Sequence, residues 1–415
     1  MAQIKSALVE SNPWWKGVFS FDYKDRAIYG EISKFMKTRQ IIALTGLRRV
    51  GKTTLLLKLV EDALAQGRDP KQILYFSFDE FKAAELREVL DAYAAMTGIS
   101  LAGGHLLVLL DEVQKLEGWE EQLKRVYDLH RNVKIVISGS ESLFLKKKSH
   151  ESLAGRMFVF RVKPLSFREF LSFRQVPYKP VPLYEKELLA LFHQFVRTSG
   201  FPELLDTDDR DIIRKYIRET VVEKILYRDI PTMLPIKDVG VLAAVFGLIA
   251  EDPGQLLELN SLSRDIGISR NTLSNYLHYL EEAYLVRKLY NFSRNKRKTE
   301  RKLKKYYPAI ISPTLAFQDD ERSQSKVLET VMVLQLDAEF FWRDVYKNEV
   351  DIILHDPATV PIEIKYGKIE TAGILRFMRQ LKLDEGCIVT NDQERQITEN
   401  GKKIRVVPAY KFLLE

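Results

Sequence analysis

The chain has 415 residues, of which 46% are hydrophobic and 29% are charged, and it carries a formal net charge of +7. This length is too great for one ordinary core and predicts about two to four domains. No apolar run approaches the roughly 18 to 20 residues of a membrane span, the N-terminus lacks a signal-peptide pattern, and the single cysteine, Cys387, excludes an internal disulfide bond. We therefore expect a cytoplasmic protein without membrane contact. The positive charge favours an acidic partner such as nucleic acid, although a basic surface kept for solubility explains it as well.

A G-x-x-x-x-G-K-T motif occupies residues 46–53 and is the most specific pattern in the chain. The apolar run at residues 41–44 predicts a buried strand before it, and the apolar run at residues 55–60 predicts a helix after it. A strand, a glycine-containing loop and a helix in this order are the setting of a P-loop, which binds nucleotide phosphates through backbone N–H groups and a helix N-terminus. The alternative is a turn with a surface lysine.

The residue types of this motif predict individual roles. Gly46 and Gly51 allow positive φ angles and a close approach of the backbone to phosphate. Lys52 would reach the β- and γ-phosphates of ATP, and the Thr53 hydroxyl would bind Mg²⁺. The predicted nucleotide-binding residues are Gly46, Leu47, Arg48, Arg49, Val50, Gly51, Lys52, Thr53 and Thr54, with Ser138 from a later strand.

A second motif supplies carboxylates to the same site. The apolar residues 106–110 lead into Asp111 and Glu112, which is the pattern of a Walker B strand. Such a strand would deliver Asp111 to the Mg²⁺ shell, and Glu112 would polarise the attacking water. The two motifs predict ATP hydrolysis, with Lys52 and Glu112 as catalytic residues.

A further buried strand is predicted at residues 133–137 and ends in small hydroxyl residues. The strand beside Walker B ends in a polar residue that senses the γ-phosphate in P-loop ATPases. Ser138 or Ser140 would fill that place.

These motifs occur in a combination that resembles a large family of archaeal and bacterial AAA+-type ATPases, often described as DExx-box ATPases, which carry a nuclease-like C-terminal domain. The matching segments are residues 46–53, 110–114, 119–120, 138–140, 153–156, 164–170 and 200–203. The resemblance spans nearly the whole chain. It implies that Arg156 contacts the γ-phosphate, either in cis or from a neighbouring subunit of a dimer or ring. The planar, charged guanidinium group of arginine suits this role because it can stabilise charge on phosphate oxygens. A structural salt bridge is the alternative.

Residues 257–280 have the layout of a helix-turn-helix. A short helix runs to Ile266, Gly267 makes the turn, and Ser269 caps a longer helix whose leucines face inward. The N-terminal end of such a second helix enters the major groove of DNA. The predicted DNA contacts on this helix are Arg270, Asn271, Ser274 and Asn275.

A two-stranded wing is predicted to follow this helix, and its tip, residues 294–305, holds at least eight cations. Phosphate neutralisation by this tip would give salt-sensitive DNA affinity without sequence preference. Winged helices also serve as protein–protein modules, which is the alternative. The cations singled out as DNA contacts are Arg294, Lys296, Arg297 and Lys298.

In the C-terminal part, residues 349–354 and 360–365 predict a hairpin that carries Asp351, Glu363 and Lys365, and Glu329 stands on an upstream helix. This set of residues resembles a PD-(D/E)xK nuclease core. The three carboxylates would hold Mg²⁺, and Lys365 would orient or activate water. No proline precedes Asp351, so a degenerate DNA-binding or packing domain is the alternative.

Together these patterns predict an α/β protein in which a P-loop NTPase parallel sheet with a helical lid is followed by a winged-helix domain and an α/β nuclease-like domain. The predicted domains are residues 1–160, 161–250, 251–312 and 313–415. The predicted function is that of a Mg²⁺-dependent ATPase that couples ATP binding and hydrolysis to the engagement or remodelling of duplex or branched DNA in repair, recombination or mobile-element defence. A nucleotide-gated switch acting on a protein partner and an ATP-regulated nuclease are the alternatives.

Overall fold

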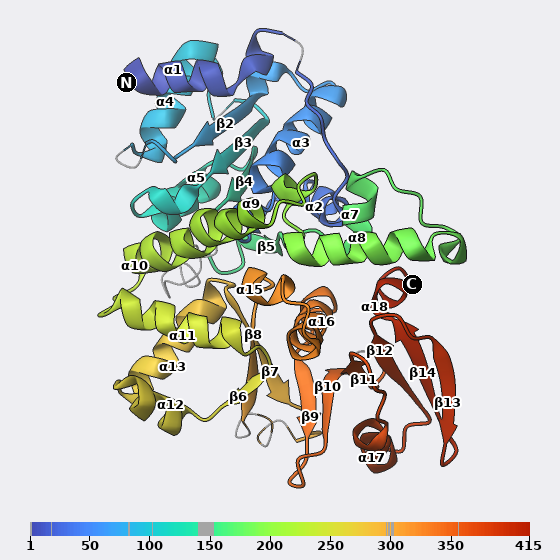
Figure 1. Cartoon of the computed structure of the whole chain (residues 1–415). Helices are drawn as coiled ribbons and strands as arrows, with labels where there is room; N and C mark the ends of the chain where they lie inside the picture. Colours follow the sequence, from blue (N-terminus) through green and yellow to red (C-terminus); the bar gives the residue numbers. More distant parts are fainter. Residues whose placement is uncertain are drawn as a thin grey trace. The chain divides into compact units, whose positions relative to one another are not determined.

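The structure is a computed structural model and describes residues 2–17, 19–81, 84–101, 103–139, 153–295, 297, 299, 303–355 and 357–415. The chain forms two compact units, which we call unit 1 (Met1–Pro164 and Asp229–Pro235) and unit 2 (Leu165–Arg228 and Ile236–Glu415). Figure 1 shows the elements of each. In the described ranges, no helix combines the length and the apolar character that a membrane crossing needs.

Unit 1 is built around a five-stranded parallel sheet with the strand order β2-β3-β4-β1-β5. The central strands are buried on both faces, as parallel strands covered by helices must be, and they read as continuous apolar runs in the sequence. The predicted strands before the P-loop, at Walker B and before Ser138 are therefore confirmed. The strands are β1 (Ile41–Thr45), β2 (Ile73–Ser77), β3 (Leu106–Asp111), β4 (Val133–Ser138) and β5 (Met157–Arg161).

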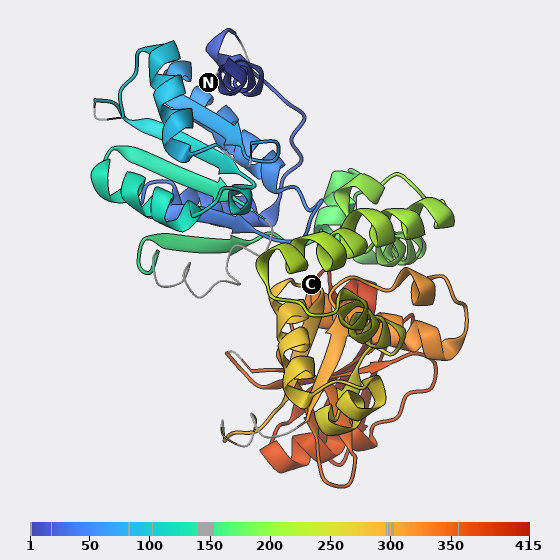
Figure 2. The same ribbon diagram turned by 90° about the vertical axis from the view of Figure 1, so that its left-hand side faces the viewer.

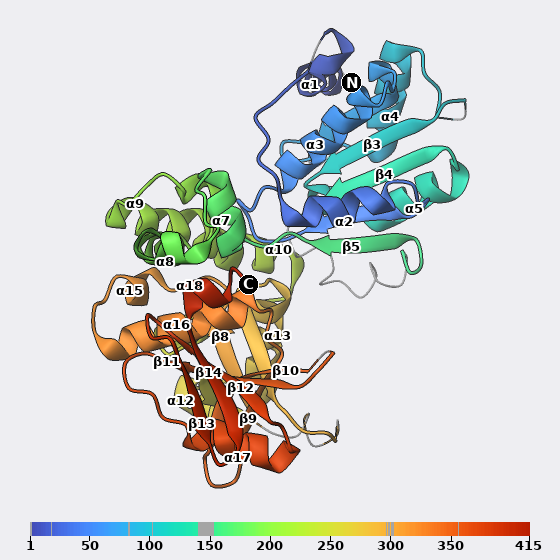
Figure 3. The ribbon, with the colours of Figure 1, turned by 90° about the vertical axis from the view of Figure 1, so that its right-hand side faces the viewer.

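Helices cover both faces of this sheet (Figure 3). One face packs against α1, α4 and α5 in a single apolar core, and α3 contacts β4 on the other face. The helices of unit 1 are α1 (Ala2–Ser11), α2 (Ala27–Phe35), α3 (Lys52–Ala65), α4 (Leu86–Thr97), α5 (Trp119–Leu129) and α10 (Ile230–Met233). Because all five strands are parallel, their carboxyl ends lie at one edge of the sheet, where ligands bind in α/β folds.

Unit 2 contains a nine-stranded mixed sheet with the order β13-β14-β12-β11-β10-β9-β7-β8-β6. β7 pairs with β9 in parallel, so one sheet runs across the domain boundary predicted at residue 312. Its strands are β6 (Gln255–Leu257), β7 (Val286–Asn291), β8 (Lys304–Pro308), β9 (Phe340–Arg343), β10 (Glu349–Leu354), β11 (Val360–Lys365), β12 (Glu385–Thr390), β13 (Arg395–Glu399) and β14 (Lys402–Pro408).

The helices of unit 2 pack on this sheet in two cores. The larger core joins α7, α8 and α16 to the inner strands, and α17 covers the other core. Helices α11, α12 and α13 lie together beside β6, β7 and β8 (Figure 2). The helices are α7 (Phe167–Phe173), α8 (Glu185–Thr198), α9 (Arg210–Lys215), α11 (Val239–Glu251), α12 (Leu259–Ile266), α13 (Arg270–Glu282), α15 (Pro313–Ala316), α16 (Glu321–Gln335), α17 (Ala372–Leu381) and α18 (Ala409–Phe412).

Two features of unit 2 differ from a simple chain of domains. The helices predicted as a lid on the ATPase sheet share a core with the C-terminal strands, where four phenylalanines of α7 and α8 pack together. Within the helical region predicted at residues 161–250, the helix α9 is followed by π-helical turns at Tyr216–Val222 and Ile225–Asp229. The division into four domains stays a prediction.

Candidate functional site

The loop between β1 and α3 has the backbone of a phosphate cradle. A Cβ atom on Gly46 would lie 2.1 Å from the carbonyl oxygen of Val162, so only glycine fits there. Arg49 (φ 67°) and Gly51 (φ 93°) adopt left-handed conformations, and α3 begins directly after Gly51. Such a loop turns successive N–H groups toward one point and adds the positive end of a helix dipole, which together suit an anion.

Lys52 is the buried cation of this loop, with 6% of its surface exposed. Its Nζ donates to the carbonyl oxygens of Gly46 (2.8 Å) and Leu47 (2.9 Å). The ammonium group is therefore held against the backbone of the loop itself. That position fits the predicted contact with nucleotide phosphates, which would replace neutral carbonyl acceptors with charged ones.

Asp111 lies at the end of β3 and is 4% exposed. Its carboxylate accepts hydrogen bonds from the hydroxyls of Thr53 (2.6 Å), Tyr75 (3.0 Å) and Ser138. Burial and the neighbouring charge of Asp111 raise the pKa of Tyr75, so this hydroxyl stays a neutral donor. The P-loop, Walker B and the strand beside it thus meet at one carboxylate.

These groups fit a magnesium ion. Thr53 and Asp111, the two residues predicted as its ligands, present hydroxyl and carboxylate oxygens that already lie within 2.6 Å of each other. Mg²⁺ prefers oxygen ligands and is commonly held by one or two protein groups together with substrate phosphates and water. Thr53 and Asp111 would hold it, and Ser138 is placed to orient the carboxylate.

Glu112 follows Asp111 in a left-handed backbone conformation (φ 54°), which is uncommon for a residue with a side chain. Its N–H donates to Oδ1 of Asp111 (3.0 Å), and its Oε2 accepts from Nε2 of Gln114 (2.6 Å). Burial raises the pKa of Glu112, and the charge of Lys52 opposes that rise. A fixed carboxylate with a raised pKa, next to the metal ligands, is suited to general-base work on a water molecule.

Two arginines support the loop in ways that the motif does not specify. Arg26, placed before α2, donates to the carbonyl oxygens of Val50 (2.8 Å) and Lys163 (2.7 Å). The side chain of Arg48 makes a bidentate ion pair with Asp229, with both N–O distances at 2.6 Å, and its predicted contact with nucleotide stays a prediction. Sequence reasoning missed Arg26, Tyr75 and Asp229 because each lies far from the motif along the chain and none carries a recognisable spacing.

Arg156 lies at the opposite edge of the sheet from the P-loop. It directly precedes β5, and its carbonyl oxygen accepts from the N–H of Ile41, the first residue of β1 (2.8 Å). Its side chain pairs with Asp128 (3.0 Å) and holds the pKa of that carboxyl below its usual range. Within one chain Arg156 therefore does not contact the P-loop, because the length of β1 separates them. A contact from a neighbouring subunit stays a prediction.

The predicted DNA contacts on α13 all lie on its exposed side. Ser269 caps this helix by accepting from the N–H of Thr272 (3.1 Å), and leucines at the inward positions are buried. Arg270, Asn271, Ser274 and Asn275 are exposed. Their role in DNA binding stays a prediction.

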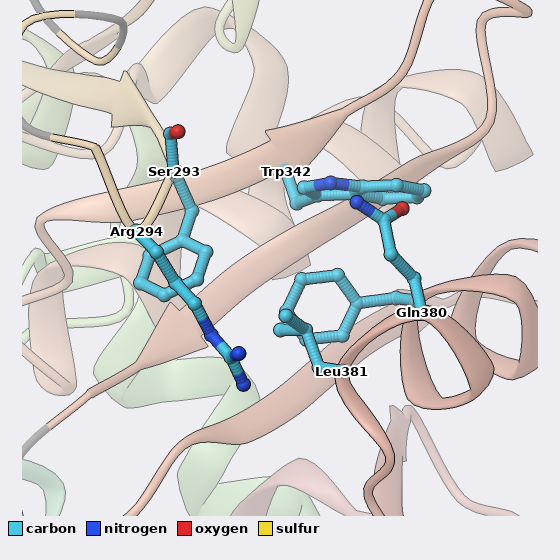
Figure 4. A pocket seen from close by; sticks show the side chains of 7 residues that line it. Ser293, Arg294, Trp342, Gln380 and Leu381 are labelled. Carbon is cyan, nitrogen blue, oxygen red and sulfur yellow. The ribbon is translucent and has the colours of Figure 1, made fainter.

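The wing cations divide into three groups. Arg294 and Arg297 are exposed, and Arg294 lines a pocket with Trp342 and Gln380 (Figure 4). Lys296 and Lys298 lie outside the described residues, as does Ser140, which was predicted together with Ser138 to sense the γ-phosphate. Lys305, counted among the wing cations, is buried in β8 with 4% of its surface exposed, so it is not available to phosphate.

Lys305 lies among the C-terminal carboxylates. Its Nζ is 3.1 Å from Glu329, 2.5 Å from Glu349 and 3.6 Å from Asp351. Burial alone would lower the pKa of Lys305, but these acidic neighbours raise it well above its usual value. Burial, followed by the charges of Glu329 and Glu363, raises the pKa of Asp351. The lysine is a permanent counter-ion within the cluster.

This arrangement does not fit the predicted nuclease metal. In the ranges that the structure describes, no group of three or more His, Cys, Asp or Glu side chains is placed to hold a metal ion. Glu363 pairs with Lys365 (2.7 Å), and Lys305 takes the charge that Glu329 and Asp351 would offer to a cation. Among the described residues, Glu329 and Asp351 face the ammonium group of Lys305, and Glu363 faces that of Lys365. The magnesium site predicted from Glu329, Asp351 and Glu363 stays a prediction that these contacts do not support.

Comparison with known proteins places these sites in context. Residues 38–171 match a family model described as an AAA domain, and residues 189–309 and 327–412 match two domains of unknown function, DUF8612 and DUF4143. An uncharacterised protein of Methanocaldococcus jannaschii is 27% identical over 90% of this chain and 85% of its own length. An uncharacterised protein of Haemophilus influenzae is 28% identical over 62% of this chain and 64% of its own length.

Solved structures that are similar to this chain include the following two. AMPPCP-bound DnaA from Aquifex aeolicus covers 64% of this chain and 90% of that chain at 13% identity and a TM-score of 0.32. C. elegans PCH-2 covers 68% of this chain and 66% of that chain at 15% identity and a TM-score of 0.25. With the family match and the P-loop geometry, residues 38–171 form an AAA-type, P-loop ATPase-like domain, and two regions that match domains of unknown function follow it.

Proposed function

We propose that the chain is a Mg²⁺-dependent ATPase whose hydrolytic cycle is coupled to DNA binding by unit 2. The observation that carries the ATPase part is the hydrogen bond of 2.6 Å between Thr53 and Asp111. This hydrogen bond joins the P-loop hydroxyl to the Walker B carboxylate. The buried Lys52 belongs to the same loop, and Glu112, whose carboxylate is held by Gln114, follows Asp111 directly. Nucleotide binding alone does not need that glutamate.

The roles of the residues follow from their positions. Backbone N–H groups of the P-loop and Lys52 would bind the phosphates, and Thr53 and Asp111 would hold Mg²⁺. The bound ion supplies charge stabilisation at the phosphoryl group. Glu112 would accept a proton from the attacking water, and the amide of Gln114 holds the Glu112 carboxylate in position.

The DNA part of the proposal is supported by unit 2. The order α11, β6, α12, α13, β7, β8 matches that of a winged helix, and the exposed face of α13 carries the four predicted contacts. Exposed Arg294 and Arg297 add positive charge near the wing. Within unit 1, Arg48 of the P-loop pairs with Asp229, the last residue of the second π-helical turn and the first residue of the segment Asp229–Pro235. Repair, recombination or mobile-element defence is the setting that we propose.

The test is ATP turnover in the presence of a panel of single-stranded, duplex and four-way-junction DNAs at two salt concentrations. DNA should raise kcat, and its apparent affinity should fall as salt rises because phosphate contacts release counter-ions. Replacing Arg270 and Asn271 by Ala should weaken the apparent DNA affinity by roughly tenfold or more. Arg322→Ala, which removes an exposed charge from α16, is the control.

Turnover that no DNA changes at low salt would overturn the coupling and favour the switch that acts on a protein partner. The nuclease alternative has less support, because the ammonium of Lys305 already pairs with Glu329 and Asp351, two of the carboxylates that cleavage would need.

A further inference from the structure

Unit 1 has a second concave site at the edge of the sheet opposite the P-loop. A cavity of about 260 Å³ opens there, and we call it the amino-edge pocket. Its walls come from connections that lead into β1, β3 and β4 and from the turn after α3. Eleven residues line it, and none is Asp or Glu, whereas six are basic. The basic residues are Lys37, Arg39, Arg68, His105, Arg131 and Lys134.

Two of these cations, Lys134 and Arg39, form hydrogen bonds with backbone carbonyl oxygens of unit 1. The Nζ of Lys134 donates to three backbone carbonyls at and after the end of α2, at 2.7 to 3.0 Å. Arg39 donates to the carbonyl oxygen of Tyr127 (2.8 Å) in α5 and lies over the Tyr127 ring. Cations in such places stabilise the negative ends of helices. Lys134 and Arg39 therefore need no ligand to explain them.

Lys37, Arg131 and Arg68 do not have such a structural role at the end of a helix in the described ranges. Lys37 and Arg131 are exposed, and neither side chain has a hydrogen bond or an ion pair with the described residues. Among the described residues, the side chain of Arg68 donates to the backbone carbonyl oxygen of His105 (2.9 Å) and to no other group, and burial lowers its pKa. Burial also lowers the pKa of Lys134 to about 8. Like charges gathered in one concavity repel one another, and a surface that serves only solubility mixes both signs.

We propose that the amino-edge pocket binds a ligand with closely spaced phosphate groups. Guanidinium and ammonium groups that lack carboxylate partners are the groups that form charge-assisted hydrogen bonds with phosphate oxygens. A phosphodiester backbone and a free oligophosphate present the same chemistry, and Lys37, Arg68 and Arg131 would meet either of them. The site goes beyond the proposed function, because neither the P-loop nor unit 2 contributes a residue to it.

The first arm of the test uses tripolyphosphate as the probe. The P-loop of the full-length protein is saturated with a magnesium complex of a non-hydrolysable ATP analogue, and tripolyphosphate is then titrated by calorimetry. Lys37→Ala/Arg131→Ala should bind the probe roughly tenfold more weakly than the wild type. Lys5→Ala/Lys16→Ala, which removes the same charge from exposed positions outside the pocket, should bind it normally. Melting temperatures of both variants check their folding.

The second arm uses a labelled single-stranded oligonucleotide, followed by fluorescence anisotropy across a salt series. If the ligand is a nucleic acid backbone, the pocket variant should lose about two units of the slope of log K against log salt relative to the control variant. A loss confined to tripolyphosphate supports the free oligophosphate. If neither probe distinguishes the pocket variant from the charge-matched control, the inference is wrong. That result would leave the ATPase proposal untouched, since no step depends on hydrolysis.

Discussion

Carboxylates converge at two places in this molecule, and the partners that they meet differ. Beside the P-loop, Asp111 is surrounded by the neutral hydroxyls of Thr53, Tyr75 and Ser138. In unit 2, Glu329, Glu349 and Asp351 surround the ammonium group of Lys305. The first carboxylate has no cationic side chain among these partners, so its oxygens are placed to meet a metal ion. The carboxylates of the second group are already paired with a cation of the same chain.

The comparison teaches that acidic residues in a nuclease-like order do not by themselves make a metal site. Hydroxyl donors orient a carboxylate without neutralising it, so a cation still gains Coulomb energy on arrival. A buried lysine already supplies a positive charge to the group, and displacing it would leave an unpaired charge in the interior. Four changes test this contrast.

The largest effect is expected for Lys52→Ala. Removing a preorganised positive group from the phosphate site should lower kcat by about a hundredfold or more. Phosphate release at saturating ATP is the measurement. Lys58→Ala is the matched control, because this lysine of the same helix pairs with Glu61 and Asp62 rather than with the loop. Equal activity of the two variants would refute the role of Lys52.

Glu112→Gln should lower kcat by roughly a hundredfold while nucleotide binding persists, since the general base is lost but the phosphate contacts remain. The wild-type rate should fall as pH drops through the pKa of Glu112, which burial raises above its ordinary value. The variant should lack this acid limb in a pH profile of kcat. An unchanged profile would show that another group accepts the proton.

Lys305→Met should destabilise the protein by about 3 to 5 kcal/mol at neutral pH, because it leaves buried carboxylates without their counter-ion. The pKa of Asp351 is raised in the folded protein, so protonation of this group favours folding, and that contribution is lost as pH rises through the raised pKa. The loss should therefore shrink toward pH values of about 4. Urea unfolding of the wild type and of Lys305→Met at several pH values measures this loss in the free energy of unfolding.

Lys304→Met, one residue away, should cost less than about 1 kcal/mol, as expected for a charge that is not buried. If Lys305→Met left stability unchanged at neutral pH, Lys305 would not be the counter-ion of the cluster. Millimolar Mg²⁺ should raise the unfolding midpoint of Lys305→Met more than that of the wild type, because the variant exposes the carboxylates to an external cation.

The smallest effect is expected for Arg156→Ala. Because Arg156 and its partner Asp128 lie at the far edge of the sheet, kcat at low protein concentration should change by less than about threefold. Turnover measured across protein concentrations checks this. A large loss that appears only at high concentration would indicate that Arg156 acts in a neighbouring subunit.

The sequence predicted those parts of the site that depend on residues close together in the chain. The P-loop, the Walker B strand and the inward face of α13 depend on spacing within a few residues, and all were located correctly. Tyr75 and Arg26 reach the site through long-range packing, which spacing does not encode. Lys305 looked like a wing cation because it follows a basic run, but the alternation of β8 turns it inward to Glu329. A shift of one residue in that strand would have reversed its role.

Calorimetric titration of ATP into the wild type and into Lys52→Ala, with and without Mg²⁺, tests the central claim most directly. The wild type should bind ATP in the presence of Mg²⁺, and both the substitution and removal of the metal should weaken that binding. A wild-type protein that binds no ATP with Mg²⁺ present, or binds it equally well without Lys52, would contradict the assignment of the nucleotide site.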